Sequence, residues 1–154
     1  LCAEMVCYYT YLGKTVYRRL CEIYEKYGYV LDKNISVQYS GLNAMKEMNA
    51  VVDALMGMKV TSLSPFAVEA VRDYSVPSRT VCATGEVQPI DIPACNCVYY
   101  ELEGGSFVCV RPSGTEPKLK IYYSLRAPDE ATAEEKLGEL KKSVDGMLGK
   151  AGKN

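Results

Sequence analysis

The residues with the clearest chemical potential lie between Arg111 and Tyr122, which read Arg-Pro-Ser-Gly-Thr-Glu-Pro-Lys-Leu-Lys-Ile-Tyr. The planar guanidinium of Arg111 can donate hydrogen bonds to two oxygens of one anion at once. Ser113 and Thr115 add hydroxyl donors. Gly114 has no side chain, so the backbone can turn tightly and its N–H groups can approach an anion closely. Together these donors predict a binding loop for a phosphate monoester.

The residues around these donors support the prediction but allow an alternative. Pro112 and Pro117 restrict the backbone at both ends of the loop, so less freedom is lost on binding. Lys118 and Lys120 are two residues apart on an apolar run, so both face one side of a strand, and Lys120 is a further candidate ligand. Glu116 places a negative charge beside the donors. The alternative is a plain Pro-Ser-Gly turn with exposed lysines.

The same string resembles the C-terminal phosphate-binding loop of the α-D-phosphohexomutase superfamily, which includes phosphoglucomutases, phosphomannomutases and phosphoglucosamine mutases. The resemblance implies that Arg111, Ser113, Gly114 and Thr115 contact the phosphate. Lys120 stands where many relatives have a second arginine, which keeps the charge and loses the fork. The similarity extends to three further segments: residues 13–28, Val71-Arg72-Asp73-Tyr74, and the hairpin sequence of residues 102–108.

Family members have four domains, which carry a phosphoserine loop, an Asp-rich Mg²⁺ loop, a sugar-recognition loop and the phosphate loop. This chain has no histidine, no Asp-x-Asp-x-Asp and no Gly-Glu-Glu-Ser string, so it lacks the first three motifs. It begins at Leu1 with residues that already predict a helix, and we expect it to be cut from a longer protein. The resemblance implies that residues 1–40 are the end of the third domain and a hinge, and that residues 41–154 are the C-terminal phosphate-binding domain.

The function implied by the resemblance is that of a phosphate-binding part without catalytic residues of its own. The full-length enzyme would interconvert hexose 1-phosphate and hexose 6-phosphate, most readily those of glucose or mannose, through a phosphoserine and a hexose 1,6-bisphosphate, with Mg²⁺. The expected partners are a hexose phosphate and the missing upstream domains, and the chain alone is expected to be inactive. The alternatives are a free-standing module that senses phosphorylated metabolites and a purely structural domain that binds no anion.

Composition excludes several other classes of function. The chain has 18 basic and 19 acidic residues and a net charge of −1, so it has no broad basic face for nucleic acid. No apolar run is long enough to span a membrane, and we expect no secretory signal. The apolar fraction of 48% is ordinary for a globular protein with a packed core.

The cysteines predict reduced thiols rather than a metal site. There are seven cysteines, no Cys-x-x-Cys spacing and no histidine, whereas a zinc site needs about four ligands in spaced pairs. Cys95 and Cys97 are two residues apart and would face the same side of a strand. We therefore expect no metal in this chain and a cytoplasmic location.

Hydrophobic periodicity predicts an α+β fold. Gly104-Gly105 predicts a two-residue hairpin turn, and Pro128-Asp129 opens a final helix. The expected architecture is an antiparallel sheet of about four strands with helices on one face, plus an N-terminal helical remnant of the preceding domain. The expected elements are helices at 3–12, 15–27 and 43–56, a short strand or linker at 29–40, and strands at 66–74, 95–103, 106–111 and 119–125. Residues 75–94 are expected to be an irregular connection, with room for a short extended piece.

The N-terminal helices carry a concentration of tyrosines, seven of the chain's 13 between Tyr8 and Tyr29. A stacking platform for bases or sugars is one interpretation. A helix surface that packs on the missing part of the third domain is the favoured one.

Overall fold

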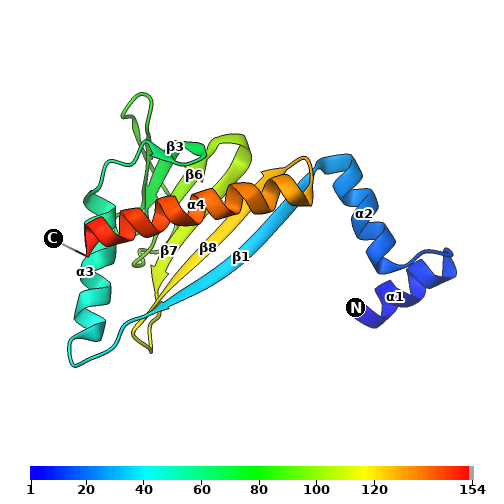
Figure 1. Cartoon of the computed structure of the whole chain (residues 1–154), viewed down its shortest axis with the longest axis horizontal. Coiled ribbons are helices and arrows are strands. Elements are labelled where there is room, and N and C mark those ends of the chain that lie inside the picture. The colour runs from blue at the N-terminus through cyan, green and yellow to red at the C-terminus, as the bar shows by residue number, and fades with distance from the viewer. Residues whose placement is uncertain (153–154) are drawn as a thin grey trace.

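The computed structural model describes residues 1–152, and it contains an eight-stranded antiparallel sheet with two helices across one face (Figure 1). The strand order is β1-β8-β7-β6-β3-β4-β5, with β2 paired to β3 at the side of this path. The strands are β1 Tyr29–Gln38, β2 Ser62–Leu63, β3 Phe66–Asp73, β4 Ser78–Val81, β5 Val87–Pro89, β6 Val98–Leu102, β7 Ser106–Pro112 and β8 Lys118–Ala127.

Two of the helices begin at residues whose side chains cap the first turn. The Thr15 side chain accepts a hydrogen bond from the N–H of Arg18, and Asp129 accepts one of 2.8 Å from the N–H of Thr132. These bonds satisfy amides that have no partner within the first turn of a helix. The helices are α1 Cys2–Tyr11, α2 Val16–Tyr27, α3 Ala44–Gly57 and α4 Glu130–Ala151.

The core lies between the sheet and the pair α3 and α4. Alternate residues of β8 are buried, and the side chains between them point to the opposite face. Figure 1 shows α3 and α4 on one side of the sheet only. The opposite face, which we call the open face, carries the intervening polar side chains. The fully buried core residues include Val52, Leu55, Val110, Leu119, Ile121, Leu125, Leu137, Leu140 and Val144.

The α+β class and the antiparallel sheet are confirmed, but the expectation of about four strands was too low. Residues 75–94, expected to be irregular, contain β4 and β5, which extend the sheet beyond β3. Both strands are short, and Pro77 and Pro89 lie at their borders, which obscures the strand pattern.

The hairpin between β6 and β7 is confirmed with a longer turn than expected. Leu102 and Ser106 are the last paired residues, so Glu103 joins Gly104 and Gly105 in a three-residue turn. Both glycines have positive φ, 73° and 75°, which is the backbone region that glycine adopts without strain.

Strand β1 is part of the sheet rather than a linker. It pairs with β8 along its whole length, from Tyr29 opposite Ala127 to Gln38 opposite Lys118. Its partly buried residues Leu31, Ile35 and Val37 pack against the core. The expectation that a domain boundary falls at residue 40 stays a prediction, but residues 29–38 belong to the same sheet as the predicted phosphate loop.

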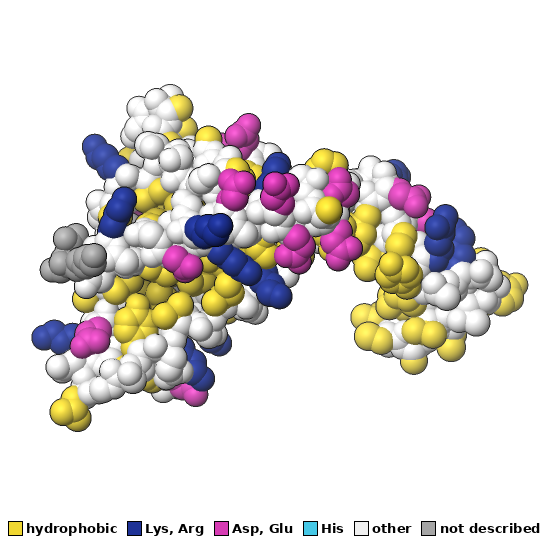
Figure 2. Space-filling model, viewed as in Figure 1, with side chains coloured by type: hydrophobic (Ala, Val, Ile, Leu, Met, Phe, Trp, Pro, Cys, Tyr) yellow, Lys and Arg dark blue, Asp and Glu magenta, His cyan; other side chains and the backbone are white. Residues whose placement is uncertain are grey.

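Helices α1 and α2 extend away from the sheet beyond the start of β1 (Figures 1 and 2). Neither helix has a buried residue. The rings of Tyr24 and Tyr29 are 4.6 Å apart and join α2 to β1. Within residues 1–152, no helix is both long and apolar enough to cross a membrane. The exposed apolar residues of these helices include Met5, Val6, Tyr8, Tyr11, Tyr17 and Tyr27.

Candidate functional site

The predicted phosphate loop joins β7 to β8 at one end of the sheet. The N–H of Ser113 donates a 2.8 Å hydrogen bond to the carbonyl of Lys118, and the N–H of Lys118 donates one of 2.7 Å to the carbonyl of Glu116. The N–H of Tyr39 donates a 2.8 Å bond to the carbonyl of Pro117 and anchors the loop to the chain after β1. Residues 113–117 are therefore fixed at both ends by backbone hydrogen bonds.

The middle of this loop offers unused backbone donors. Among the residues that the structure describes, the N–H groups of Gly114, Thr115 and Glu116 donate to no protein acceptor, and all three residues are exposed. Successive N–H groups of a turn can surround an anion oxygen. The arrangement can therefore supply several backbone donors beside the hydroxyl groups of Ser113 and Thr115.

Gly114 is not explained by the fold. Glycine was expected here because it permits a tight turn, but the φ of Gly114 lies outside the positive region. A Cβ placed on Gly114 would meet no protein atom within 4 Å. The fold would therefore accommodate alanine here. The space that glycine leaves empty lies on the solvent side of the loop.

Two cations face each other beside the loop. Arg111 on β7 and Lys120 on β8 are direct cross-strand partners, so their side chains lie on the same face of the sheet. Lys118 forms a 3.0 Å ion pair with Glu116, which neutralises that carboxylate. Within residues 1–152, neither Arg111 nor Lys120 forms an ion pair. The predicted residues thus meet at one end of the β7–β8 hairpin, with positive charge that no acidic side chain neutralises.

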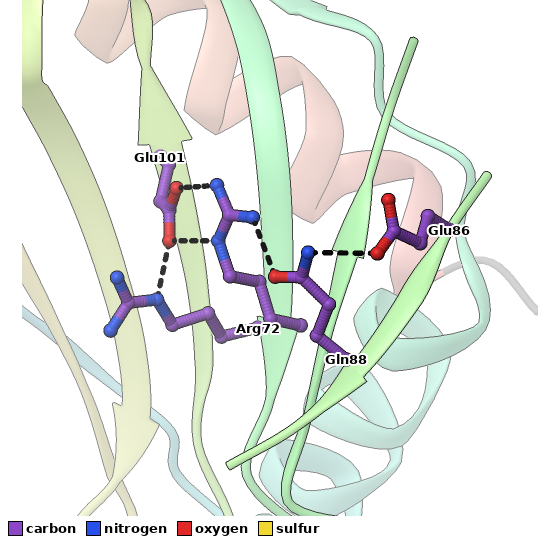
Figure 3. Close-up of polar contacts among 5 residues, drawn as sticks. Arg72, Glu86, Gln88 and Glu101 are labelled. Atoms are coloured by element: carbon purple, nitrogen blue, oxygen red, sulfur yellow. Dashed lines mark hydrogen bonds and ion pairs between the residues drawn. The ribbon is translucent and has the colours of Figure 1, made fainter. Parts of the chain in front are cut away.

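A second polar cluster lies on the open face and was not predicted (Figure 3). Glu101 accepts hydrogen bonds from Arg79 of 2.6 and 2.9 Å, and it also accepts one from the Nε of Arg72. Arg79 also donates a 3.1 Å hydrogen bond to Gln88, and Gln88 donates one of 3.0 Å to Glu86. The hydrogen bonds from Arg79 lower the pKa of Glu101; burial opposes the shift, and the bond from Arg72 adds to it.

The arginines of this cluster are already occupied, in contrast to Arg111. Besides its pair with Glu101, the Arg72 guanidinium lies 5.1 Å from the ring centre of Tyr99. Tyr99 in turn stacks on Phe107 at 4.7 Å. Arg72 and Glu101 are 29 residues apart in sequence and Arg79 and Glu101 are 22 apart, so no local spacing could have indicated the cluster. We interpret it as a structural clamp across β3, β4 and β6.

A hollow of about 370 Å³ lies apart from the loop, beside β3, β4 and the segment after α3. Its lining is largely apolar and includes Met58, Val60, Val71 and Cys82. It lacks the concentration of donors that a phosphate needs. The loop is therefore the stronger candidate for an anion site.

The described residues do not fit a metal site. Over residues 1–152, no group of three His, Cys, Asp or Glu side chains could hold a metal ion. The Mg²⁺ that the family resemblance implies for a full-length enzyme has no set of ligands in this part of the chain. We therefore assign no step of any reaction here to Mg²⁺.

Comparison with known proteins identifies the family of this chain. Residues 94–144, which include the loop and both flanking strands, match the family described as phosphoglucomutase/phosphomannomutase, C-terminal domain. The crystal structure of parafusin (phosphoglucomutase) from Paramecium, in an open form, is similar in fold, with a TM-score of 0.53. The match covers 89% of this chain and 23% of the parafusin chain. Its sequence identity of 12% limits that likeness to the fold.

Bacterial phosphoglucomutases are similar in sequence. The protein from Staphylococcus saprophyticus is 31% identical over 122 residues, which are 78% of this chain and 22% of that protein. The protein from Staphylococcus haemolyticus is 34% identical over 113 residues, 73% of this chain and 20% of that protein. The chain thus spans about a fifth of the length of these relatives. It belongs to the phosphoglucomutase/phosphomannomutase family and contains that family's C-terminal domain.

Proposed function

We propose that residues 111–120 bind the phosphate group of a sugar phosphate. The observation that carries the proposal is the combination of Arg111 and Lys120, without acidic partners, and three successive loop amides without protein acceptors. Arg111 supplies a bidentate contact, the amides of Gly114 and Thr115 supply directed backbone donors, and the Ser113 and Thr115 hydroxyl groups complete the set. Lys120 adds charge with looser geometry.

In the whole protein, this loop would act within a phosphohexomutase that interconverts hexose 1-phosphate and hexose 6-phosphate. Proteins named phosphoglucomutase align with most of this chain, and the chain covers only 22% of the first of them. The phosphoserine chemistry and the hexose 1,6-bisphosphate that the family resemblance implies require residues outside this chain. The task of this chain's residues is to hold the phosphate that is not reacting, which orients the sugar and contributes remote binding energy.

The isolated loop should bind weakly. A hydrogen bond to a charged group contributes about 1.5–3 kcal/mol, and two or three of them must offset the freedom lost on binding. A net of about 4 kcal/mol corresponds to a dissociation constant on the order of a millimolar. Closure of further domains over the sugar would exclude water and strengthen the same contacts.

The test is a titration of the chain with glucose 6-phosphate, followed by the amide chemical shifts. We expect the signals of Gly114 and Thr115 to move with glucose 6-phosphate and not with glucose. Arg111→Ala should weaken binding at least about tenfold, which is about 1.4 kcal/mol. Arg126→Ala is the matched control, because Arg126 is an exposed arginine on the neighbouring strand β8, at the end of that strand away from the loop. Loop signals that stay unmoved at tens of millimolar would refute the proposal.

The chain alone should not turn over glucose 1-phosphate. The reason is chemical: its described residues offer neither the phosphoserine motif nor a metal site. Mutase activity that follows the purified chain through chromatography would show that this division of tasks is wrong.

A further inference from the structure

Two of the seven cysteines lie side by side next to the loop. The Sγ atoms of Cys97 and Cys109 are 3.4 Å apart, which is close enough for one thiol to donate a hydrogen bond to the other. Cys109 lies in β7 opposite Tyr99 of β6, and Cys97 immediately precedes β6. Both are free thiols in this structure. Their proximity depends on the pairing of β6 with β7 and is invisible in the spacing of residues 95 and 97.

The two sulfur atoms differ in environment. Cys97 is buried, with 7% of its surface exposed, whereas Cys109 is half-buried and alternates with exposed Arg111 on β7. The hydrogen bond between the two thiols is the main cause that lowers the pKa of Cys109 and raises that of Cys97. Burial opposes the shift at Cys109, and the positive charge of Arg111 adds to it. Cys109 is thus the more readily ionised thiol, and the Cys97 sulfur lies within reach of it.

Cys82 shows that this arrangement is particular to the pair. It is also half-buried, but its Sγ lies 3.7 Å from the carbonyl oxygen of Val60 and contacts no second thiol. Burial raises the pKa of Cys82, so its thiolate is disfavoured. Cys82 therefore serves as an internal reference for a cysteine that is partly buried and unpaired.

We propose that Cys97 and Cys109 are a redox couple that a peroxide converts reversibly into a disulfide. The Cys109 thiolate attacks one oxygen of hydrogen peroxide, the O–O bond breaks, and hydroxide leaves, which gives a sulfenic acid at Cys109. The Cys97 sulfur then attacks the Cys109 sulfur, the S–O bond breaks, and water leaves with the Cys97 proton. Two thiols and one hydrogen peroxide become one disulfide and two waters, and an external dithiol reverses the change. The inference does not depend on phosphate binding by the loop.

The experiment is disulfide mapping of the dilute chain after brief treatment with hydrogen peroxide and alkylation of the remaining thiols. Trypsin leaves Cys82, Cys95, Cys97 and Cys109 in one peptide, because no lysine or arginine lies between Arg79 and Arg111. Glutamyl endopeptidase cuts after Glu101 or Glu103 and separates Cys97 from Cys109. We expect a Cys97–Cys109 linked pair, lighter than the two free peptides by two hydrogens, which disappears after treatment with dithiothreitol.

Variants decide between this pair and its neighbours. Cys95→Ser should leave the link intact, whereas Cys97→Ser should abolish it and let Cys109 proceed to sulfinic acid. Cys82→Ser is the matched control and should change nothing. The proposal is overturned if Cys109 links to Cys95 instead, or if Cys97 and Cys109 stay reduced while the exposed cysteines are oxidised. It is also overturned if Cys109 reacts no faster than Cys82.

Discussion

Arg111 and Lys120 are paired directly across β7 and β8, and both present a positive charge on the same face of the sheet. Cross-strand partners have Cβ atoms about 4.5–5.5 Å apart, at which like charges destabilise the folded state. Within residues 1–152, no acidic side chain forms an ion pair with either of them. Repulsion between the two positive charges therefore lowers the free energy of unfolding, and a bound anion would reduce this repulsion.

The first prediction follows from this cost. Lys120→Gln should raise the free energy of unfolding by about 0.2–1 kcal/mol in phosphate-free buffer. The same change should weaken glucose 6-phosphate binding, by less than Arg111→Ala does, because an ammonium is the looser ligand. Urea unfolding and the shift titration measure the two effects. Lys118→Gln is the control, and it should not stabilise the chain, because Lys118 already pairs with Glu116.

The second prediction concerns Gly114. Alanine meets no protein atom within 4 Å at this position, and its φ is not positive. Gly114→Ala should therefore leave stability unchanged or raise it by about 0.4–1 kcal/mol through the unfolded state. If an anion sits against the loop amides, the added methyl group should nevertheless weaken glucose 6-phosphate binding several-fold.

The comparison for Gly114 is Gly104→Ala, at a turn with φ of 73°. That change should destabilise the fold and leave phosphate binding intact in the folded molecules. A Gly114→Ala chain that binds glucose 6-phosphate as tightly as the parent would show that the loop amides do not contact the phosphate.

The third prediction concerns the pH dependence of stability. The pKa of Glu101 is lowered in the folded chain, chiefly by hydrogen bonds from Arg79. The contribution of Glu101 to the free energy of unfolding is therefore fully present above the unfolded pKa of about 4.3. It is lost as the pH falls through the lower folded value. Glu101→Gln should therefore destabilise the chain by roughly 1–3 kcal/mol at neutral pH. The difference from the parent should shrink below about pH 4.

Urea midpoints measured between neutral and acid pH test this dependence. Glu135→Gln, at an exposed position on α4, should change the midpoint little at any pH. A Glu101→Gln penalty that stays constant as the pH falls would mean that packing, not the charge of Glu101, stabilises this cluster.

The parts of the fold that could be predicted from sequence are those with strong local signals. Asp129 caps α4 as expected, and the alternation from Leu119 to Leu125 reproduces the buried face of β8. The candidate phosphate ligands could be proposed from sequence because most of them lie within one short loop, and their role stays a prediction. What was missed depends on contacts between distant strands: Glu101 with its arginines, and Cys97 with Cys109.

Strand β1 was predicted only in part. Its polar stretch at residues 32–34 is exposed and resembles a linker, so the sequence left open whether residues 29–40 form a short strand or a linker. An edge strand can carry polar residues because one of its sides faces solvent, and its membership in the sheet depends on pairing with β8 at the far end of the sequence.

The last prediction places the limit of independent folding at Gly28 rather than at residue 40. A chain that starts at Gly28 keeps β1 and loses only α1 and α2, which contain no buried residue. It should unfold cooperatively with nearly the parent's free energy of unfolding. A chain that starts at residue 41 loses the partner of β8, the apolar side chains of Leu31, Ile35 and Val37, and the Tyr39 bond to the loop. It should be destabilised by more than about 3 kcal/mol. Amide exchange in the parent should likewise be fast in α1 and α2 and slow in β1 and β8. If both truncated chains unfold at the same urea concentration, β1 contributes nothing to the domain and the boundary belongs at residue 40.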